Sequence, residues 1–169
     1  MKAHFAGFAR YNAWANRRLY EAAAALTDAE RRSDQGAAFG SLHATLNHLL
    51  VTDVIWMARI RGVKGPAWGL DHIAHDDFDD LRAAREALDA DIVEGVDALR
   101  ESDILASEIA YTRVSSPEPI VQPLAEALAH LFNHQTHHRG QCHMILTRLT
   151  GAAPALDLLF FHREARAGA

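Results

Sequence analysis

The chain has 169 residues, 49% of them hydrophobic, so it can bury one core but is too short for two comfortable domains. Its 17 Lys and Arg residues against 22 Asp and Glu residues give a formal net charge of -5, and no basic cluster stands out, which disfavours nucleic-acid binding. Cys142 is the only cysteine, which excludes an internal disulfide. From the length of the chain we expect one domain over residues 1–169.

The N-terminal segment predicts a first helix over residues 3–26. Apolar residues recur there at helical steps, and no proline interrupts them. The segment has no apolar run long enough for a signal peptide or a membrane span. We therefore expect a cytoplasmic protein that does not bind a membrane. The following stretch, TDAERRSDQGAAFGS, predicts a connection.

Two further helices are predicted in the middle of the chain. Ser41 is a good N-cap for a helix that runs to about Arg61, where the glycine-rich stretch GVKGPAWG ends it. This helix is apolar over most of its length, which predicts burial. The acidic segment HDDFDD precedes a third helix over residues 77–101, since acidic residues suit the positive end of a helix dipole.

The C-terminal part predicts a short hairpin or an extended loop, then a long helix. Residues 104–122 are rich in β-branched residues and contain a Ser-Ser-Pro-Glu-Pro break. Pro123 can be the first residue of a fourth helix that Gly151 ends, and a short helix over residues 157–164 follows. The four long segments predict an all-α four-helix bundle, in which functional side chains project into the core.

The histidine count departs from ordinary usage, with 11 copies, and the spacing of these residues indicates a metal site. His134 and His138 lie four residues apart on the fourth predicted helix, so both imidazoles point to one side and can bind one ion. Such a pair is common by chance, so a third ligand is needed. His48 is the best candidate, because it lies in the apolar run LNHLLVTDVIW, where an unpartnered imidazole is costly.

Alternatives to this hypothesis remain open. A lone buried histidine such as His48 is more often bonded to a neighbouring carbonyl or hydroxyl group than to a metal, although the three histidines together favour the metal. Gln141 returns to nearly the face of His134, where it can orient a ligand, contact substrate or pack against a helix. His137 either contacts a metal ligand and helps to orient it, or it lies in solvent.

Other reactive residues are expected to stay outside the site. Asp53 is either a carboxylate near the metal or the partner of an arginine, and we do not count it as a ligand. Cys142 is expected to be a small buried hydrophobe rather than a nucleophile. His143 projects away from His134. Five further histidines are not spaced from another candidate ligand in a way that suggests a shared metal ion. We expect them at the surface or in loops: His4, His43, His72, His75 and His162.

The C-terminal segment HLFNHQTHHRGQCHMILTRLTGAAPALDLLFF resembles the signature of the DinB (damage-inducible, YfiT-like) family. FARYNAWANRRLYEAAAAL resembles the first helix of that family, and SLHATLNHLLVTDVIWMARIRG resembles its second, so the resemblance spans nearly the whole chain. It implies a DinB-type bundle, often a homodimer, with His48, His134 and His138 as the metal ligands. The family often has glutamate where this chain has Asp53.

The resemblance also implies a class of reaction. Three neutral imidazoles leave a divalent ion with an open position, as in catalytic zinc sites, and zinc or nickel suits these ligands best. Members of the family resemble low-molecular-weight thiol transferases, so the expected function is metal-activated attack of a thiol or water on a small electrophile. The alternatives are a metal-dependent hydrolase, a non-catalytic metal-binding stress-response protein, and a bundle whose histidines bind no metal.

Overall fold

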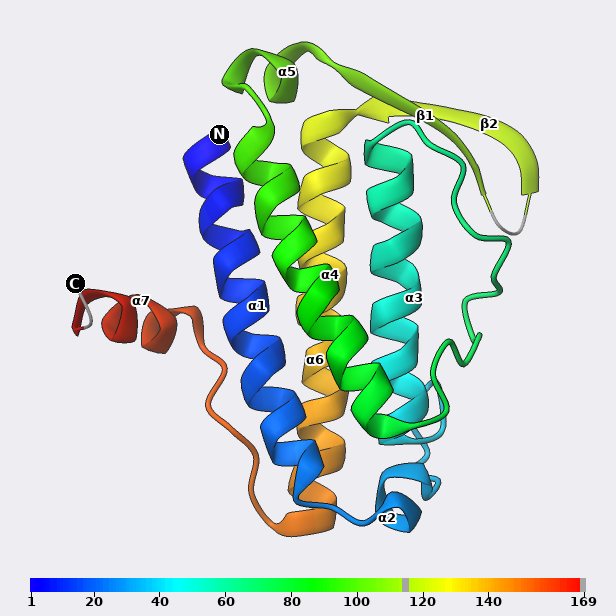
Figure 1. Cartoon of the computed structure of the whole chain (residues 1–169), viewed down its shortest axis with the longest axis vertical. Coiled ribbons are helices and arrows are strands. Elements are labelled where there is room, and N and C mark those ends of the chain that lie inside the picture. The colour runs from blue at the N-terminus through cyan, green and yellow to red at the C-terminus, as the bar shows by residue number, and fades with distance from the viewer. Residues whose placement is uncertain (114–115, 168–169) are drawn as a thin grey trace.

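The computed structural model describes residues 1–113 and 116–167, and most of these residues are helical (Figure 1). Four long helices run side by side along the long axis: α1 (Lys2–Ala24), α3 (Leu42–Ile60), α4 (Phe78–Ala98) and α6 (Leu124–Thr150). Helix α1 packs against α4 and α6, and α3 packs against the same two helices. The all-α prediction is confirmed in this broad sense.

Shorter elements join and extend these helices. They are α2 (Asp28–Arg32), α5 (Glu101–Ala106) and α7 (Leu158–Ala167), together with two antiparallel strands, β1 (Glu108–Arg113) and β2 (Ser116–Pro123). The strands confirm the predicted hairpin, of which residues 114–115 lie outside the described part of the chain. The sequence prediction missed α2 and α5, because both are short and have too few buried residues to give a helical pattern.

Local chemistry explains where the main helices begin and end. Ser41 caps α3 as predicted, since its side chain accepts a hydrogen bond from the backbone N–H of Ala44. Asp77 caps α4 in the same way. Pro123 is the residue before α6 rather than its first residue, so that prediction was wrong by one position. Gly151 ends α6 with a φ of 78°, a conformation that favours glycine.

The interior consists of two large apolar clusters and a small third one on α1, with buried polar residues between the two large clusters along the helices. One large cluster includes Phe5, Ile92 and Leu128, and the other includes Leu19 and Leu81. On each long helix, buried polar side chains lie between or beside the apolar residues of the two large clusters: Asn12 and Asn16, His48 and Asp53, Arg85 and Asp89, and Gln135, His138 and Arg139. This polar layer contains the candidate site. Within the described residues, we find no helix with the length and hydropathy needed to cross a membrane.

Candidate metal centre

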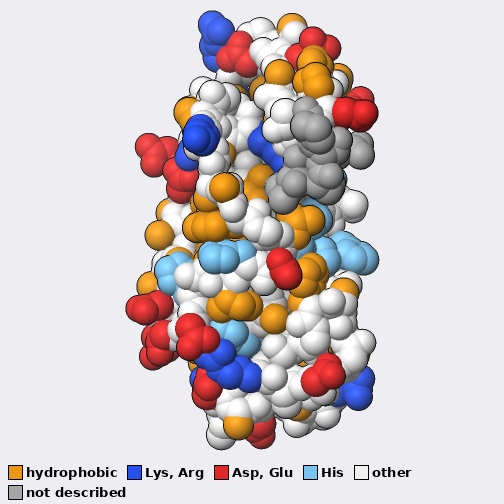
Figure 2. All heavy atoms as spheres, turned by 90° about the vertical axis from the view of Figure 1, so that its right-hand side faces the viewer, with side chains coloured by type: hydrophobic (Ala, Val, Ile, Leu, Met, Phe, Trp, Pro, Cys, Tyr) orange, Lys and Arg blue, Asp and Glu red, His pale blue; other side chains and the backbone are white. Residues whose placement is uncertain are grey.

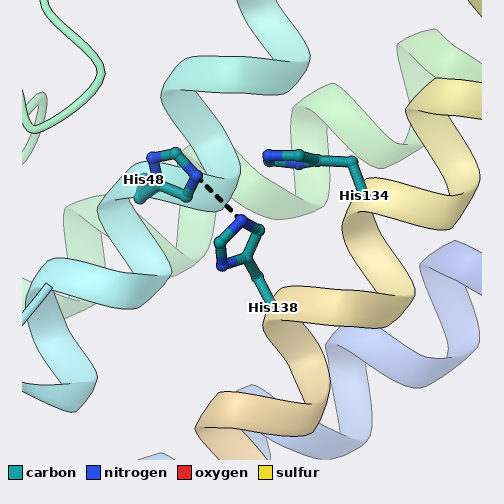
Figure 3. A group of neighbouring side chains, drawn as sticks. All are labelled: His48, His134 and His138. Carbon is teal, nitrogen blue, oxygen red and sulfur yellow. Dashed lines mark hydrogen bonds between the residues drawn. The ribbon is translucent and has the colours of Figure 1, made fainter. Parts of the chain in front are cut away.

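Three histidines from two facing helices converge in the polar layer. His48 comes from α3, and His134 and His138 come from successive turns of α6 (Figure 3). Each offers one ring nitrogen, and these three nitrogens lie within 4.8 Å of one another. His48 and His138 are buried, with 3% and 8% of their surface exposed, and His134 is partly buried. The group can therefore hold a metal ion.

The orientation of His48 is fixed by the segments on both sides of α3. Its Nδ1 lies 2.7 Å from the carbonyl oxygen of Leu70. A carbonyl oxygen can only accept a hydrogen bond, so Nδ1 must carry the proton, and a neutral ring then has a free lone pair on Nε2. The ring of Phe39 stacks on that of His48, with centroids 3.8 Å apart. The two contacts leave the Nε2 edge of His48 facing α6.

His138 is held in the same tautomer from its own helix. Its Nδ1 lies 2.8 Å from Oε1 of Gln141, three residues further along α6. The amide nitrogen of Gln141 lies 3.4 Å from Nε2 of His137, an arrangement that keeps Oε1 turned toward His138. We therefore assign the proton of His138 to Nδ1 and the lone pair to Nε2. Gln141 thus orients a candidate ligand, which is one of the roles considered for it.

These assignments create an unfavourable contact that a cation relieves. Nε2 of His48 and Nε2 of His138 lie 3.2 Å apart, the pair joined by the dashed line in Figure 3. Two lone pairs facing each other repel, whereas two nitrogens bound to one zinc ion in tetrahedral geometry lie roughly 3.3 Å apart. Nδ1 of His134 is buried and has no hydrogen-bond partner among the described residues. The residues present therefore fit a divalent metal ion.

Burial also keeps the three imidazoles in the form that binds metal. Desolvation lowers the pKa of His48 and of His138 below the ordinary value for histidine. For His134, desolvation together with the neighbouring histidines lowers the pKa to about 3. A metal binds neutral imidazole, so no proton has to leave these rings at neutral pH.

Asp53 belongs to a buried ionic network beside the histidines rather than to the metal group. Its Oδ2 accepts hydrogen bonds from Arg85 at 2.8 Å and from Gln135. Arg85 also lies 2.8 Å from Oδ1 of Asp89. Of the two roles considered for Asp53, the structure shows the arginine partner. Arg139 extends the network by donating to Gln135 at 3.2 Å, so the layer joins α3, α4 and α6.

Cys142 and the other histidines mostly lie where the sequence predicts. Cys142 is fully buried in an apolar cluster, and desolvation raises the pKa of its thiol to about 12, so it is no nucleophile at neutral pH. His4, His72 and His162 are exposed, and His75 is partly buried in a loop. The prediction for His43 was wrong: it is only 2% exposed, because α3 is buried from its first turn and Asn47 contacts the ring.

Sequence reasoning missed the two contacts that orient His48. Phe39 lies in the connection before α3, and Leu70 lies in the segment after it, where the sequence shows no repeating pattern. A phenylalanine within a polar, glycine-containing connection is a weak signal that could have been noticed. The sequence contains no signal for the contact with the Leu70 carbonyl, because every residue has a backbone carbonyl group. Figure 2 shows histidine side chains in a band across the middle of the face that carries α3.

Comparisons with known proteins agree with the resemblance seen in the sequence. The model of the DinB family matches residues 1–168, which is essentially the whole chain. A search of curated proteins found no match.

Proposed function

The chain belongs to the DinB family, and from this membership and the histidine site we propose that it is a metal-dependent enzyme. The proposed ligands are His48, His134 and His138, and zinc or nickel suits three imidazoles best. The observation that carries the proposal is the pair of Nε2 atoms 3.2 Å apart, each left with a lone pair by the hydrogen bond on the opposite nitrogen.

The proposed reaction is the attack of a thiol or water on a small electrophile. A divalent ion with an open position makes such a nucleophile available at neutral pH. The protein keeps the imidazoles neutral. The Leu70 carbonyl orients His48, and the Gln141 amide orients His138. The protein cannot supply the thiol, because Cys142 is fully buried with a raised pKa. A thiol nucleophile must therefore be a low-molecular-weight co-substrate, which favours thiol S-transfer, with hydrolysis as the alternative.

The family match supports several further proposals about the whole molecule. We propose that residues 1–169 form one DinB-type four-helix bundle built on α1, α3, α4 and α6. We also propose that it works in the cytoplasm as a homodimer, with small molecules as its substrates. These proposals rest on family membership and on the packing of the four long helices.

The enzyme hypothesis is tested with untagged protein loaded with zinc or nickel. One arm supplies 1-chloro-2,4-dinitrobenzene with glutathione, cysteine or dithiothreitol, and a second arm supplies 4-nitrophenyl acetate without thiol. We expect metal-dependent acceleration in the thiol arm that is lost in His134→Ala. Acceleration in the second arm alone would support the hydrolase. Metal-loaded protein that accelerates neither reaction would contradict both forms of the enzyme hypothesis and support a non-catalytic metal-binding protein.

Gln141→Leu is expected to weaken metal binding without removing a ligand. The change deletes the acceptor that fixes the tautomer of His138, and the loss of such supporting contacts costs about 10-fold to 100-fold in metal affinity. Chelator competition against zinc measures the change. Gln141→Glu keeps an oxygen acceptor at this position and serves as the matched control, for which we expect affinity close to that of the parent protein. Equal affinities for the Leu variant and the parent would contradict this role.

A further inference from the structure

A cavity of about 550 Å³ lies apart from the three histidines, none of which lines it. It is bounded by the C-terminal part of α3, by residues 62–69 and by β1. Its wall combines apolar and aromatic side chains, such as those of Ile55, Trp68 and Tyr111, with polar groups. The adjoining residue Leu70 orients His48, so the cavity and the histidine site share one loop.

Arg59 brings a positive charge to this cavity, where it contacts two aromatic rings and one backbone carbonyl. Its guanidinium group lies 4.7 Å from the centre of the Trp56 ring and 4.2 Å from that of Tyr111. One N–H group donates to the carbonyl oxygen of Thr112 at 3.3 Å. Its other N–H groups donate to no residue in the described part of the chain. Contacts with two rings orient this guanidinium, and its remaining N–H groups can bind a planar anion.

The charge of Arg59 is not balanced locally. In the described ranges it forms no ion pair, although most other partly buried arginines of the chain do. Lys64 adds a second positive charge, and none of the described residues that line the cavity is Asp or Glu. Desolvation lowers the pKa of Arg59, which shows that burial disfavours the unpaired cation. Although the protein has a net charge of -5, the described lining of this cavity thus contains two cations and no carboxylate.

We propose that this cavity binds a small organic carboxylate, with the carboxylate on Arg59 and an apolar or aromatic body against Trp68 and Ile55. Guanidinium and carboxylate match as two parallel hydrogen bonds, which is the strongest pairing that Arg59 can make. The apolar and aromatic side chains of the wall suit the rest of such a molecule. The site needs no metal, so it stands whether or not the histidine site is catalytic.

The proposal is tested by titration calorimetry with benzoate, with neutral benzamide of the same shape, and with inorganic phosphate. The proteins are the parent chain, Arg59→Gln and Arg61→Gln, each in metal-loaded and chelator-treated form. Arg61 is the matched control, because it is exposed, does not line the cavity and pairs with Asp91 instead. We expect benzoate to bind the parent about tenfold more tightly than benzamide, and Arg59→Gln to lose that preference.

Each outcome decides between a cavity site and other sources of binding. The His134→Ala variant should still bind benzoate, because a carboxylate on Arg59 does not depend on a metal. Loss of benzoate binding in that variant or in chelator-treated protein would assign the carboxylate to the metal and overturn the proposal. Equal binding of benzoate and benzamide, unchanged affinity in Arg59→Gln, or tighter binding of phosphate would overturn it as well. Circular dichroism of Arg59→Gln is the check that this variant remains folded.

Discussion

His134→Ala is expected to yield protein without stoichiometric metal. The change leaves two of the three proposed ligands, and because the loss of a mere supporting contact costs about 10-fold to 100-fold in affinity, the loss of a ligand should exceed about 100-fold. Elemental analysis of untagged protein, followed by titration with zinc and with nickel, measures the effect. Binding to the folded state also stabilises it, so excess metal should raise the melting temperature of the parent by on the order of 10 °C.

The control for this prediction is His143→Ala. His143 lies on the same helix and does not belong to the convergent group, so its variant should keep the metal and the thermal shift. Parent protein that was never exposed to a chelator and contains no stoichiometric metal would support the reading in which the histidines are structural. The same conclusion would follow if His134→Ala bound metal as tightly as the parent.

Arg85→Met should cause the largest loss of stability of any single substitution considered for this protein. Arg85 is 2% exposed and neutralises two buried carboxylates, Asp53 and Asp89. Burial opposes its charge, but Asp89 and Asp53 outweigh this effect and raise its pKa above the ordinary value. Removing one partner from a buried ionic group costs about 3–5 kcal/mol, or on the order of 10 °C in melting temperature for a chain of this size.

Arg82→Met is the matched control for this substitution. Arg82 lies one turn before Arg85 on α4 and pairs with Glu86 at the surface, where an ion pair contributes about 0–1 kcal/mol. Thermal unfolding of both variants separates the buried pair from a general effect of losing an arginine. Replacing Asp53 and Asp89 by Asn in the Arg85→Met background should recover part of the loss. If Arg85→Met and Arg82→Met had the same melting temperature, the buried network would not contribute the stability assigned to it.

Some features of this protein follow from local sequence alone. The positions of α1, α3, α4 and α6 follow from apolar periodicity and from end signals such as Ser41 and Gly151. The pairing of His134 with His138 follows from helical geometry, because residues four apart share a face on any helix. The burial of His48 follows from its apolar neighbours. Each of these depends on residues close together in the chain, which is why the sequence predicts them.

Only the tertiary structure decides which distant residues meet. It joins His48 to the α6 pair, and through Leu70 and Gln141 it sets the tautomers that leave two lone pairs face to face. It also pairs Asp53 with Arg85, which lies 32 positions away, and it buries His43 against the sequence prediction. These contacts depend on how α3, α4 and α6 pack together, and a backbone carbonyl or an opposite charge elsewhere in the chain leaves no local pattern from which such packing can be predicted.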